Sequence, residues 1–264
     1  MTVESYRLQG VDAFDIEFDR QLHLPPDVAS ESLAGYDGIL AAKSWHKRNL
    51  GTPELPYRVL VPGLGVGTLA CALAAYEQYL HTLEERQVEI DGFDIDHSAI
   101  NFASTNFASI NNSRYRARFY QADWDRQSTW DELAPGNYHL VLLNPPYLPE
   151  DEVVALDYSN VPERTMFGGQ DGLDHFRTIF PMLPQLMDRT HGGEILFRFQ
   201  TPGSTYTDKL KEIIASAFGE EGLDWPSGLF PSEGETSIKP DNLGRRRWIS
   251  LGRIAVPGEV QYND

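Results

Sequence analysis

The sequence has little of several features that mark common classes of protein. One cysteine, Cys71, excludes an intrachain disulfide framework and a zinc site made of several cysteines. No run of about 18 uncharged apolar residues occurs, so no membrane span is expected. The opening residues, MTVESYRLQG, lack a basic region followed by an apolar run, which is the mark of a secretory signal. These absences predict a soluble, cytoplasmic protein.

Positive charge is also scarce. Lys and Arg number 22 against 39 Asp and Glu, which gives the 264 residues a formal net charge of −17. Such a chain repels a phosphate backbone or an anionic membrane, so nucleic acid is a poor partner and a cationic ligand is tolerated. Hydrophobic residues make up 41% of the chain, which is enough for a sizeable core.

Two regions of different character follow one another. Residues 1–56 are acidic and interrupted by prolines, and we interpret them as a short N-terminal cap with a helix from Asp27 to about Lys47. Residues 57–264 alternate strand and helix patterns and form the main domain. Repeated βα units predict an α/β fold with a mostly parallel sheet and helices on both faces.

The elements expected in the main domain follow from apolar runs and turn residues. Strands are expected at 57–62, 88–94, 115–123, 138–144 and 194–200, with a closing pair at about 223–230 and 246–255. Helices are expected at about 66–85, 96–111, 171–189 and 204–219.

A glycine-rich turn follows the first strand of this domain. Gly63, Gly65 and Gly67 occupy alternate positions, where they let the backbone turn sharply and approach a ligand closely. The spacing differs from the dinucleotide fingerprint and lacks the lysine of a P-loop. A tight turn that binds nothing is the alternative.

Acidic residues follow the next two strands where each strand ends. Asp94 can accept hydrogen bonds from the two hydroxyls of a ribose, although a helix N-cap is the alternative and Asp96 is the neighbouring candidate. Asp123 can accept a hydrogen bond from an adenine amino group, and Trp124 can cover the ring. The alternatives are a solvated aspartate and a core tryptophan.

The most specific feature is Asn-Pro-Pro-Tyr, residues 144–147, directly after the fourth strand. Two prolines fix the backbone and remove two donors, so the carbonyl of Pro145 can face outward beside the side-chain carbonyl of Asn144. Two rigidly held acceptors suit an NH₂ group, and Tyr147 offers a flat face to a planar group. A rigid turn with a packed tyrosine is the alternative.

With these motifs the chain resembles class I S-adenosylmethionine-dependent methyltransferases of the NPPY type. Within them it is most similar to the HemK/PrmC family of protein-glutamine N5-methyltransferases. FGGQDGLD points to this family rather than to adenine methyltransferases. The supporting stretches are PGLGVGTLA (62–70), GFDIDHSAINFASTN (92–106), LVLLNPPYLPEDE (140–152), FGGQDGLDHFR (167–177) and NLGRRRWISL (242–251).

The resemblance implies a Rossmann-like, seven-stranded sheet with one antiparallel strand near the C-terminus, and S-adenosylmethionine as cofactor. The glycines of the turn would lie under the methionine part of the cofactor, Asp94 would hold the ribose, and Asp123 and Trp124 would meet the adenine. The acceptor nitrogen would be held by Asn144, Pro145 and Tyr147, with Asn144 also beside the cofactor.

The chain departs from the family's pattern in several places. Val61 stands where an acidic residue is usual in the family. His139 stands where the family has an aspartate. Residues 1–56 do not resemble the family's N-terminal helical bundle. Near the fifth strand the family tends to have a glutamate and a glycine, whereas this chain has Phe-Arg-Phe-Gln at 197–200. The expected histidine roles are structural for His97, His139 and His175.

These features lead to a primary hypothesis and three alternatives. The primary one is an N-methyltransferase acting on an amide, guanidine or amine nitrogen of a small polar molecule or peptide. The acidic segment 149–163 suggests a cationic acceptor, or is simply solvated. The alternatives are methylation of a release-factor glutamine, adenine N6 methylation of DNA or RNA, and cofactor binding without catalysis, which Val61 favours.

Overall fold

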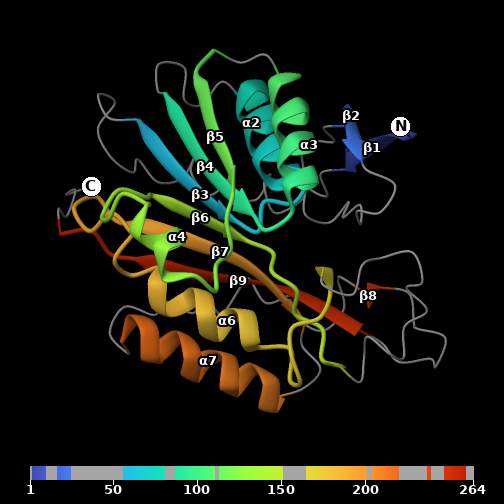
Figure 1. Ribbon diagram of the computed structural model, residues 1–264. Helices are drawn as coiled ribbons and strands as arrows, with labels where there is room; N and C mark the ends of the chain where they lie inside the picture. Colours follow the sequence, from blue (N-terminus) through green and yellow to red (C-terminus); the bar gives the residue numbers. More distant parts are fainter. Residues whose placement is uncertain are drawn as a thin grey trace. The chain divides into compact units, whose positions relative to one another are not determined.

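The computed structural model divides the chain into two compact units, Met1–Asp123 with Tyr138–Leu142, and Trp124–Asn137 with Leu143–Asp264 (Figure 1). This division is not the boundary expected at residue 56, and the separation of 1–56 from 57–264 stays a prediction. The helix expected from Asp27 lies outside the described residues. The structure describes residues 2–9, 17–24, 56–80, 87–110, 113–150, 165–200, 204–219, 237–238 and 247–259.

The first unit is built on parallel strands in the order β5-β4-β3-β6. Strand β6 is a continuous apolar run that is buried on both faces, as parallel strands usually are, and β3 is buried apart from the half-buried Arg58. The pairs Val59↔Leu140 and Leu60↔Val141 set their register. The strand bounds are β3 Tyr57–Pro62, β4 Val88–Asp94, β5 Tyr115–Gln121 and β6 Leu140–Leu143.

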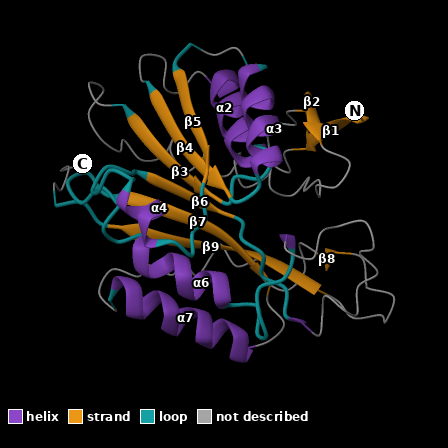
Figure 2. Ribbon diagram, viewed as in Figure 1, coloured by secondary structure: helices purple, strands orange, loops and turns teal. Residues whose placement is uncertain are grey.

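Two helices complete the βα units of the first unit, α2 (Thr68–Leu80) and α3 (His97–Ala108) (Figure 2). Helix α3 packs beside α2 and against β4 and β5. Its buried positions fall on one stripe with helical spacing, namely Ala99, Ile100, Ala103 and Asn106. The stripe holds the helix against the sheet.

An antiparallel hairpin of β1 (Thr2–Gln9) and β2 (Glu17–Leu24) precedes these elements. Strand β2 lies next to α3. The sequence analysis did not predict the hairpin. Phe18, Leu22 and Leu24 do alternate with other residues at strand spacing, but Arg20 interrupts the pattern.

The second unit contains β7 (Gly193–Gln200), which pairs with the antiparallel β9 (Arg247–Val256), and β8 (Ser237–Ile238) at the other side of β9. The strands described from β3 to β9 therefore number seven, and β9 is the antiparallel strand near the C-terminus that the resemblance implies. The strand expected at 223–230 lies outside the described residues.

Aromatic side chains pack the helices of the second unit onto β7. Phe176 and Phe180 contact Phe197 with ring centroids 6.0 and 5.1 Å apart, and Tyr206 stacks on Phe199 at 6.4 Å. These contacts bring α6 (Asp174–Ile179), the 3₁₀ turn η2 (Phe180–Met182) and α7 (Ser204–Phe218) to the strand. The short helix α4 (Gln127–Asp131), with Trp130 buried, was not predicted.

The single helix expected over 171–189 is wrong. Helix α6 ends at Ile179 and is followed by the 3₁₀ turn. Pro181 and Pro184 lie in the second half of the expected helix, and proline removes a helical donor and clashes with the preceding turn. Leu183 and Leu186 are nevertheless buried, so the apolar periodicity located the core correctly. Among the described helices none has the length and apolarity needed to cross a membrane.

Candidate functional site

The glycine turn after β3 takes a conformation that other residues rarely adopt. Gly63, Gly65 and Gly67 have φ values of 66°, 54° and 84°. A Cβ at Gly67 would lie 3.1 Å from the Cα of Ala103 in α3, so this glycine lets the helix approach the turn. A Cβ at Gly65 would meet nothing within 4 Å, which leaves room for a ligand against the backbone there.

Hydrogen bonds from two neighbouring elements hold the turn in place. The amide of Leu64 donates to the carbonyl of Phe93 at the end of β4 (2.9 Å), and Nδ2 of Asn106 in α3 donates to the carbonyl of Val66 (3.0 Å). Asn106 is fully buried. Sequence reasoning missed it, although an asparagine within the apolar stripe of a helix is a usable signal, because a buried amide needs partners.

Asp94 connects the end of β4 to the glycine turn. Its Oδ2 accepts a hydrogen bond from the amide of Gly65 (2.9 Å), and its Oδ1 accepts one from the amide of Asp96 (2.9 Å). The N-cap of α3 is Asp96, whose Oδ1 accepts from the amide of Ser98 (2.8 Å), so Asp94 does not have that role. A carboxylate oxygen can accept more than one hydrogen bond, and a ribose hydroxyl is a suitable donor to such a group.

The carboxyl end of β5 lies beside Asp94. The amide of Ala122 donates to the carbonyl of Asp94 (3.0 Å), which places the half-buried Asp123 next in the chain. Ile95 has 58% of its surface exposed, and it is the exposed large apolar side chain among the described residues. An apolar side chain next to Asp94 can lie against a planar base, and sequence reasoning missed it.

Strand β6 is parallel to β3 and therefore ends at the same edge of the sheet as the glycine turn. The Asn-Pro-Pro-Tyr turn follows β6 directly. Pro145 is buried, and Asn144 and Tyr147 are half-buried with Oδ1 of Asn144 inaccessible to solvent. After the turn, Leu148 forms a bridge with Phe167. The turn is thus fixed at both of its ends.

The stretch from 167 to 174, FGGQDGLD, packs directly on this turn. The amide of Leu148 donates to the carbonyl of Met166 (2.9 Å), and the amide of Gly168 donates to the carbonyl of Leu148 (2.8 Å). A Cβ at Gly168 would lie 2.8 Å from the carbonyl oxygen of Pro146 and from the Cα of Tyr147. Only glycine at position 168 allows the two backbones to come this close. This contact gives a physical reason for the two motifs, FGGQDGLD and NPPY, to occur in the same chain.

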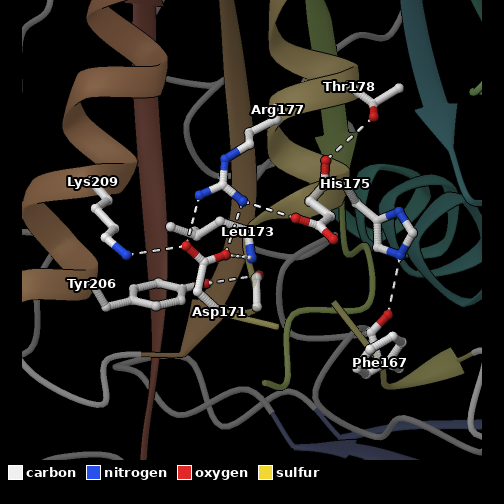
Figure 3. Close-up of polar contacts among 10 residues, drawn as sticks. Phe167, Asp171, Leu173, His175, Arg177, Thr178, Tyr206 and Lys209 are labelled. Atoms are coloured by element: carbon white, nitrogen blue, oxygen red, sulfur yellow. Dashed lines mark hydrogen bonds and ion pairs between the residues drawn. The ribbon is translucent and has the colours of Figure 1, made fainter. Parts of the chain in front are cut away.

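A charge network holds the same stretch on its other side (Figure 3). Arg177 in α6 makes two hydrogen bonds to Asp171, with Nη1–Oδ1 2.8 Å and Nη2–Oδ2 2.7 Å. Lys209 in α7 lies 3.3 Å from Oδ2. The Arg177 guanidinium holds the pKa of the Asp171 carboxyl well below its usual range. None of these three residues was predicted as part of the site.

Trp124 is packed within the second unit. Its ring meets that of His175 at 5.0 Å in an edge-on contact, and its carbonyl accepts a hydrogen bond from Nε1 of Trp130 (2.7 Å). Nε2 of His175 lies 3.2 Å from the carbonyl of Phe167, so this nitrogen carries the hydrogen. Trp124 is only half-buried, so it is not the core tryptophan of the alternative interpretation.

The predicted site residues thus form two sets, one in each unit. The first unit joins Gly65 to Asp94 and holds Gly63, Gly67 and Asp123, and the second holds Trp124, Asn144, Pro145 and Tyr147. His139 belongs to neither set, because its Nδ1 accepts from the amide of Arg58 (3.1 Å) and its ring stacks on Tyr57. Val61 is fully buried in β3 and offers no polar group.

Comparison with known proteins gives one sequence relative. No family model matches the chain. A release factor glutamine methyltransferase of Rhodospirillum rubrum is 31% identical over 136 residues, which are 48% of this chain and 34% of the relative. The match therefore spans about a third of the length of that relative.

Solved structures share the fold at low sequence identity. SMU.776, a candidate methyltransferase whose structure is a complex with SAH, has a TM-score of 0.53 at 10% identity, covering 90% of this chain and 53% of SMU.776. The DszA carbon methyltransferase has a TM-score of 0.50 at 14% identity, covering 89% and 57%. The chain has the Rossmann-like α/β fold of class I methyltransferases, as the sequence predicts.

Proposed function

We propose that this chain is an S-adenosylmethionine-dependent N-methyltransferase that acts on a planar nitrogen of a small polar molecule or of a peptide. The proposal depends mainly on the rigid turn after β6, in which Gly168 packs against Pro146 and Tyr147. A turn held this closely presents its acceptors in one orientation, which is what nitrogen positioning requires.

The first unit supplies the residues that would hold the cofactor. Gly65 leaves its side of the turn open, and Asp94 is fixed beside it by the Gly65 amide. Asp123 and Ile95 would meet the adenine, one through a carboxylate and the other through an apolar face. When bound, S-adenosylmethionine supplies a methyl group already activated by its sulfonium, so the protein's main task is to position the acceptor.

The second unit supplies the acceptor contacts. The side-chain carbonyl of Asn144 and the backbone carbonyl of Pro145 would accept the two hydrogens of an NH₂ group. This requires the half-buried Asn144 side chain to turn its Oδ1, which is inaccessible to solvent in this structure, toward the acceptor. With both hydrogens engaged, the nitrogen lone pair is directed away from the protein's acceptors. The ring of Tyr147 lies against the flat face of the amide or guanidine, which restricts its rotation.

The charge of the chain favours acceptors that are neutral or cationic. A net charge of −17 opposes polyanionic substrates and attracts a protonated guanidine or amine, which must lose a proton to solvent before its nitrogen can accept the methyl group. The acidic segment 149–163, which suggested a cationic acceptor, lies almost entirely outside the described residues. Glu150 at its start is exposed.

Methylation of a glutamine side chain in a release factor is the second candidate. It is supported by the 31% identity to the release factor glutamine methyltransferase of Rhodospirillum rubrum. A glutamine amide also has the planar NH₂ group that the Asn144–Pro145 acceptors suit. The two candidates share the same chemistry at nitrogen and differ in what carries it.

Methyl transfer from isotope-labelled S-adenosylmethionine tests both candidates. The acceptor panel is free arginine and other amino acids, simple amines, a purified release factor with its Gly-Gly-Gln loop, and adenine-containing oligonucleotides. We expect N-methyl products from an amino acid, an amine or the release factor, identified by mass spectrometry. Labelling of adenine alone, or of no member of the panel, contradicts the proposal.

Asn144→Ala is the variant that tests the site assignment. Removing one of two acceptors should lower turnover by at least about a hundredfold, because the nitrogen is no longer held in line. Calorimetric titration with S-adenosylhomocysteine checks that cofactor binding persists. Unchanged turnover in Asn144→Ala contradicts the assignment even if methyl transfer occurs.

A further inference from the structure

We propose that the Asp171–Arg177 ion pair is a positioning device for the Asn-Pro-Pro-Tyr turn. Through the loop of residues 168–172, the pair holds Tyr147 and its neighbours in the orientation needed for the acceptor. The inference deepens the proposed function and rests on it for the role of Tyr147. Its structural part, control of the turn by the ion pair, can be tested separately.

The loop and the turn are in direct contact through glycine. Gly168 lies so close that a Cβ would come within 2.8 Å of Pro146 O, and one at Gly172 would strike the carbonyl oxygen of Tyr147. Gly172 also has φ of 78°, a conformation that favours glycine. Because packed surfaces transmit displacement, any shift of this loop moves Tyr147.

The loop in turn is fixed by Asp171. Its carboxylate receives the two Arg177 hydrogen bonds, the Lys209 ammonium, and the amide of Leu173 (3.3 Å). A two-bonded guanidinium–carboxylate pair defines an orientation as well as a distance. Arg177 also contacts Asp174 at 2.9 Å, which keeps the guanidinium plane in place.

Both cations come from helices that are anchored in the core. Phe176 and Ile179, on either side of Arg177 in α6, are fully buried. Leu210, next to Lys209 in α7, is also buried, and Tyr206 of the same helix donates to the carbonyl of Gly172 (3.3 Å). Asp171 therefore links the glycine-containing loop to both helices, through Arg177 to α6 and through Lys209 to α7.

The exposure of the pair argues for positioning over stability. The side chains of Arg177 and Asp171 are 43% and 30% exposed. Ion pairs this exposed contribute little to folding free energy, because water screens them and ordering two side chains has an entropic cost. The two hydrogen bonds between Arg177 and Asp171 are therefore better explained by a role in fixing the loop's geometry than by a role in stabilising the fold.

Hydrogen–deuterium exchange provides a test that needs no methyl acceptor. In full-length Arg177→Met, the amides of Leu148 and Gly168 should exchange about three- to tenfold faster, because their hydrogen bonds to the carbonyls of Met166 and Leu148 open when the loop is released. Arg177→Lys, which keeps one charge contact, should lie between wild type and Arg177→Met. Should Arg177→Met not fold, Asp171→Asn replaces it.

Arg118→Met is the matched control. Arg118 pairs with Asp91 at 2.8 Å, with side chains 60% and 21% exposed, and both residues belong to the first unit. We expect this variant to leave exchange at Leu148 and Gly168 unchanged. The inference is overturned if Arg177→Met exchanges like wild type at these amides, or if Arg118→Met accelerates them equally.

Kinetics then connect the turn to the reaction. With whichever acceptor is methylated, Arg177→Met should lower kcat about tenfold while KM and the Kd for S-adenosylhomocysteine change less than about twofold. If Arg177→Met binds S-adenosylhomocysteine more weakly but keeps its kcat, the positioning role is overturned. Failure of every acceptor contradicts the proposed function, whereas the exchange result still decides the control of the turn.

Discussion

Two glycines of the turn after β3 have left-handed backbones for different reasons. Gly67 adopts φ of 84° where α3 leaves no room for a side chain, and Gly65 adopts φ of 54° with open space on its Cβ side. Steric contact within the protein explains the first but not the second. The open space beside Gly65 fits our proposal that a ligand approaches the backbone there.

Gly65→Ala should therefore weaken cofactor binding without a large loss of stability. The left-handed backbone costs alanine about 1 kcal/mol, and the added methyl group enters the space where the cofactor would lie. We expect the Kd for S-adenosylhomocysteine to rise at least about tenfold by calorimetry.

Gly136→Ala is the control for this variant. Gly136 has φ of 67° and, like Gly65, nothing within 4 Å of its Cβ position, but it lies in the turn before the amino end of β6. Gly136→Ala should lose about as much unfolding free energy as Gly65→Ala, but its affinity for S-adenosylhomocysteine should be unchanged. Equal affinities for the two variants would argue against a cofactor beside Gly65.

At the level of elements, the ends of helices and strands position the chemistry. Asp96 caps α3, Asp94 ties β4 to the glycine turn, and Asn106 ties α3 to the same turn. In the second unit α6 and α7 supply the cations that fix the loop after the Asn-Pro-Pro-Tyr turn. The bonds of Asp94 to Gly65 and of Asn106 to Val66 join residues 29 and 40 positions apart in the sequence.

The link between α6 and the loop predicts a pH dependence of stability. The pKa of Asp171 is lowered, chiefly by the Arg177 hydrogen bonds, from its ordinary value of 3.8. The stabilisation is thus complete above about pH 4 and is lost as the pH falls from there through the folded-state pKa. Because the pair is part exposed, it amounts to about 0.5–1 kcal/mol.

Urea unfolding of wild type and Asp171→Asn between pH 3 and 8 checks this prediction. The difference in unfolding free energy between the two proteins should stay constant from about pH 5 to 8 and shrink below about pH 4. A difference that changes between pH 5 and 8 would mean that another titrating group, and not Asp171, is responsible.

At the scale of the whole molecule, the charge of −17 limits the substrates. Polynucleotide binding depends on neutralising phosphates with Lys and Arg, which are outnumbered here. The chain should therefore give no anisotropy change with a short labelled DNA duplex or RNA hairpin up to about 10 μM protein, even at low salt. Saturable binding below that concentration would revive the adenine N6 alternative.

Local signals in the sequence predicted the strands that lie at the centre of the sheet. The bounds of β3 and β4 agree with the expected 57–62 and 88–94, because the apolar positions of YRVLVP and VEIDGFD end at Pro62 and Asp94 before turn residues. The expected helix over 171–189 failed because apolar spacing was given more weight than two prolines. The N-terminal hairpin was missed because its alternation is interrupted.

The sequence by itself determined the fold class and the two motifs of the candidate site. These depend on local periodicity, on glycine and proline, and on short spacings, all of which can be read along the chain. The antiparallel strand near the C-terminus was expected only from the resemblance to a known family. Only the tertiary structure decided that Asp96 and not Asp94 caps α3, that Asn106 holds the glycine turn, and that Asp171 and Arg177 hold the loop against Tyr147. Such contacts depend on which side chains the fold brings together, and 40 residues separate Asn106 from Val66.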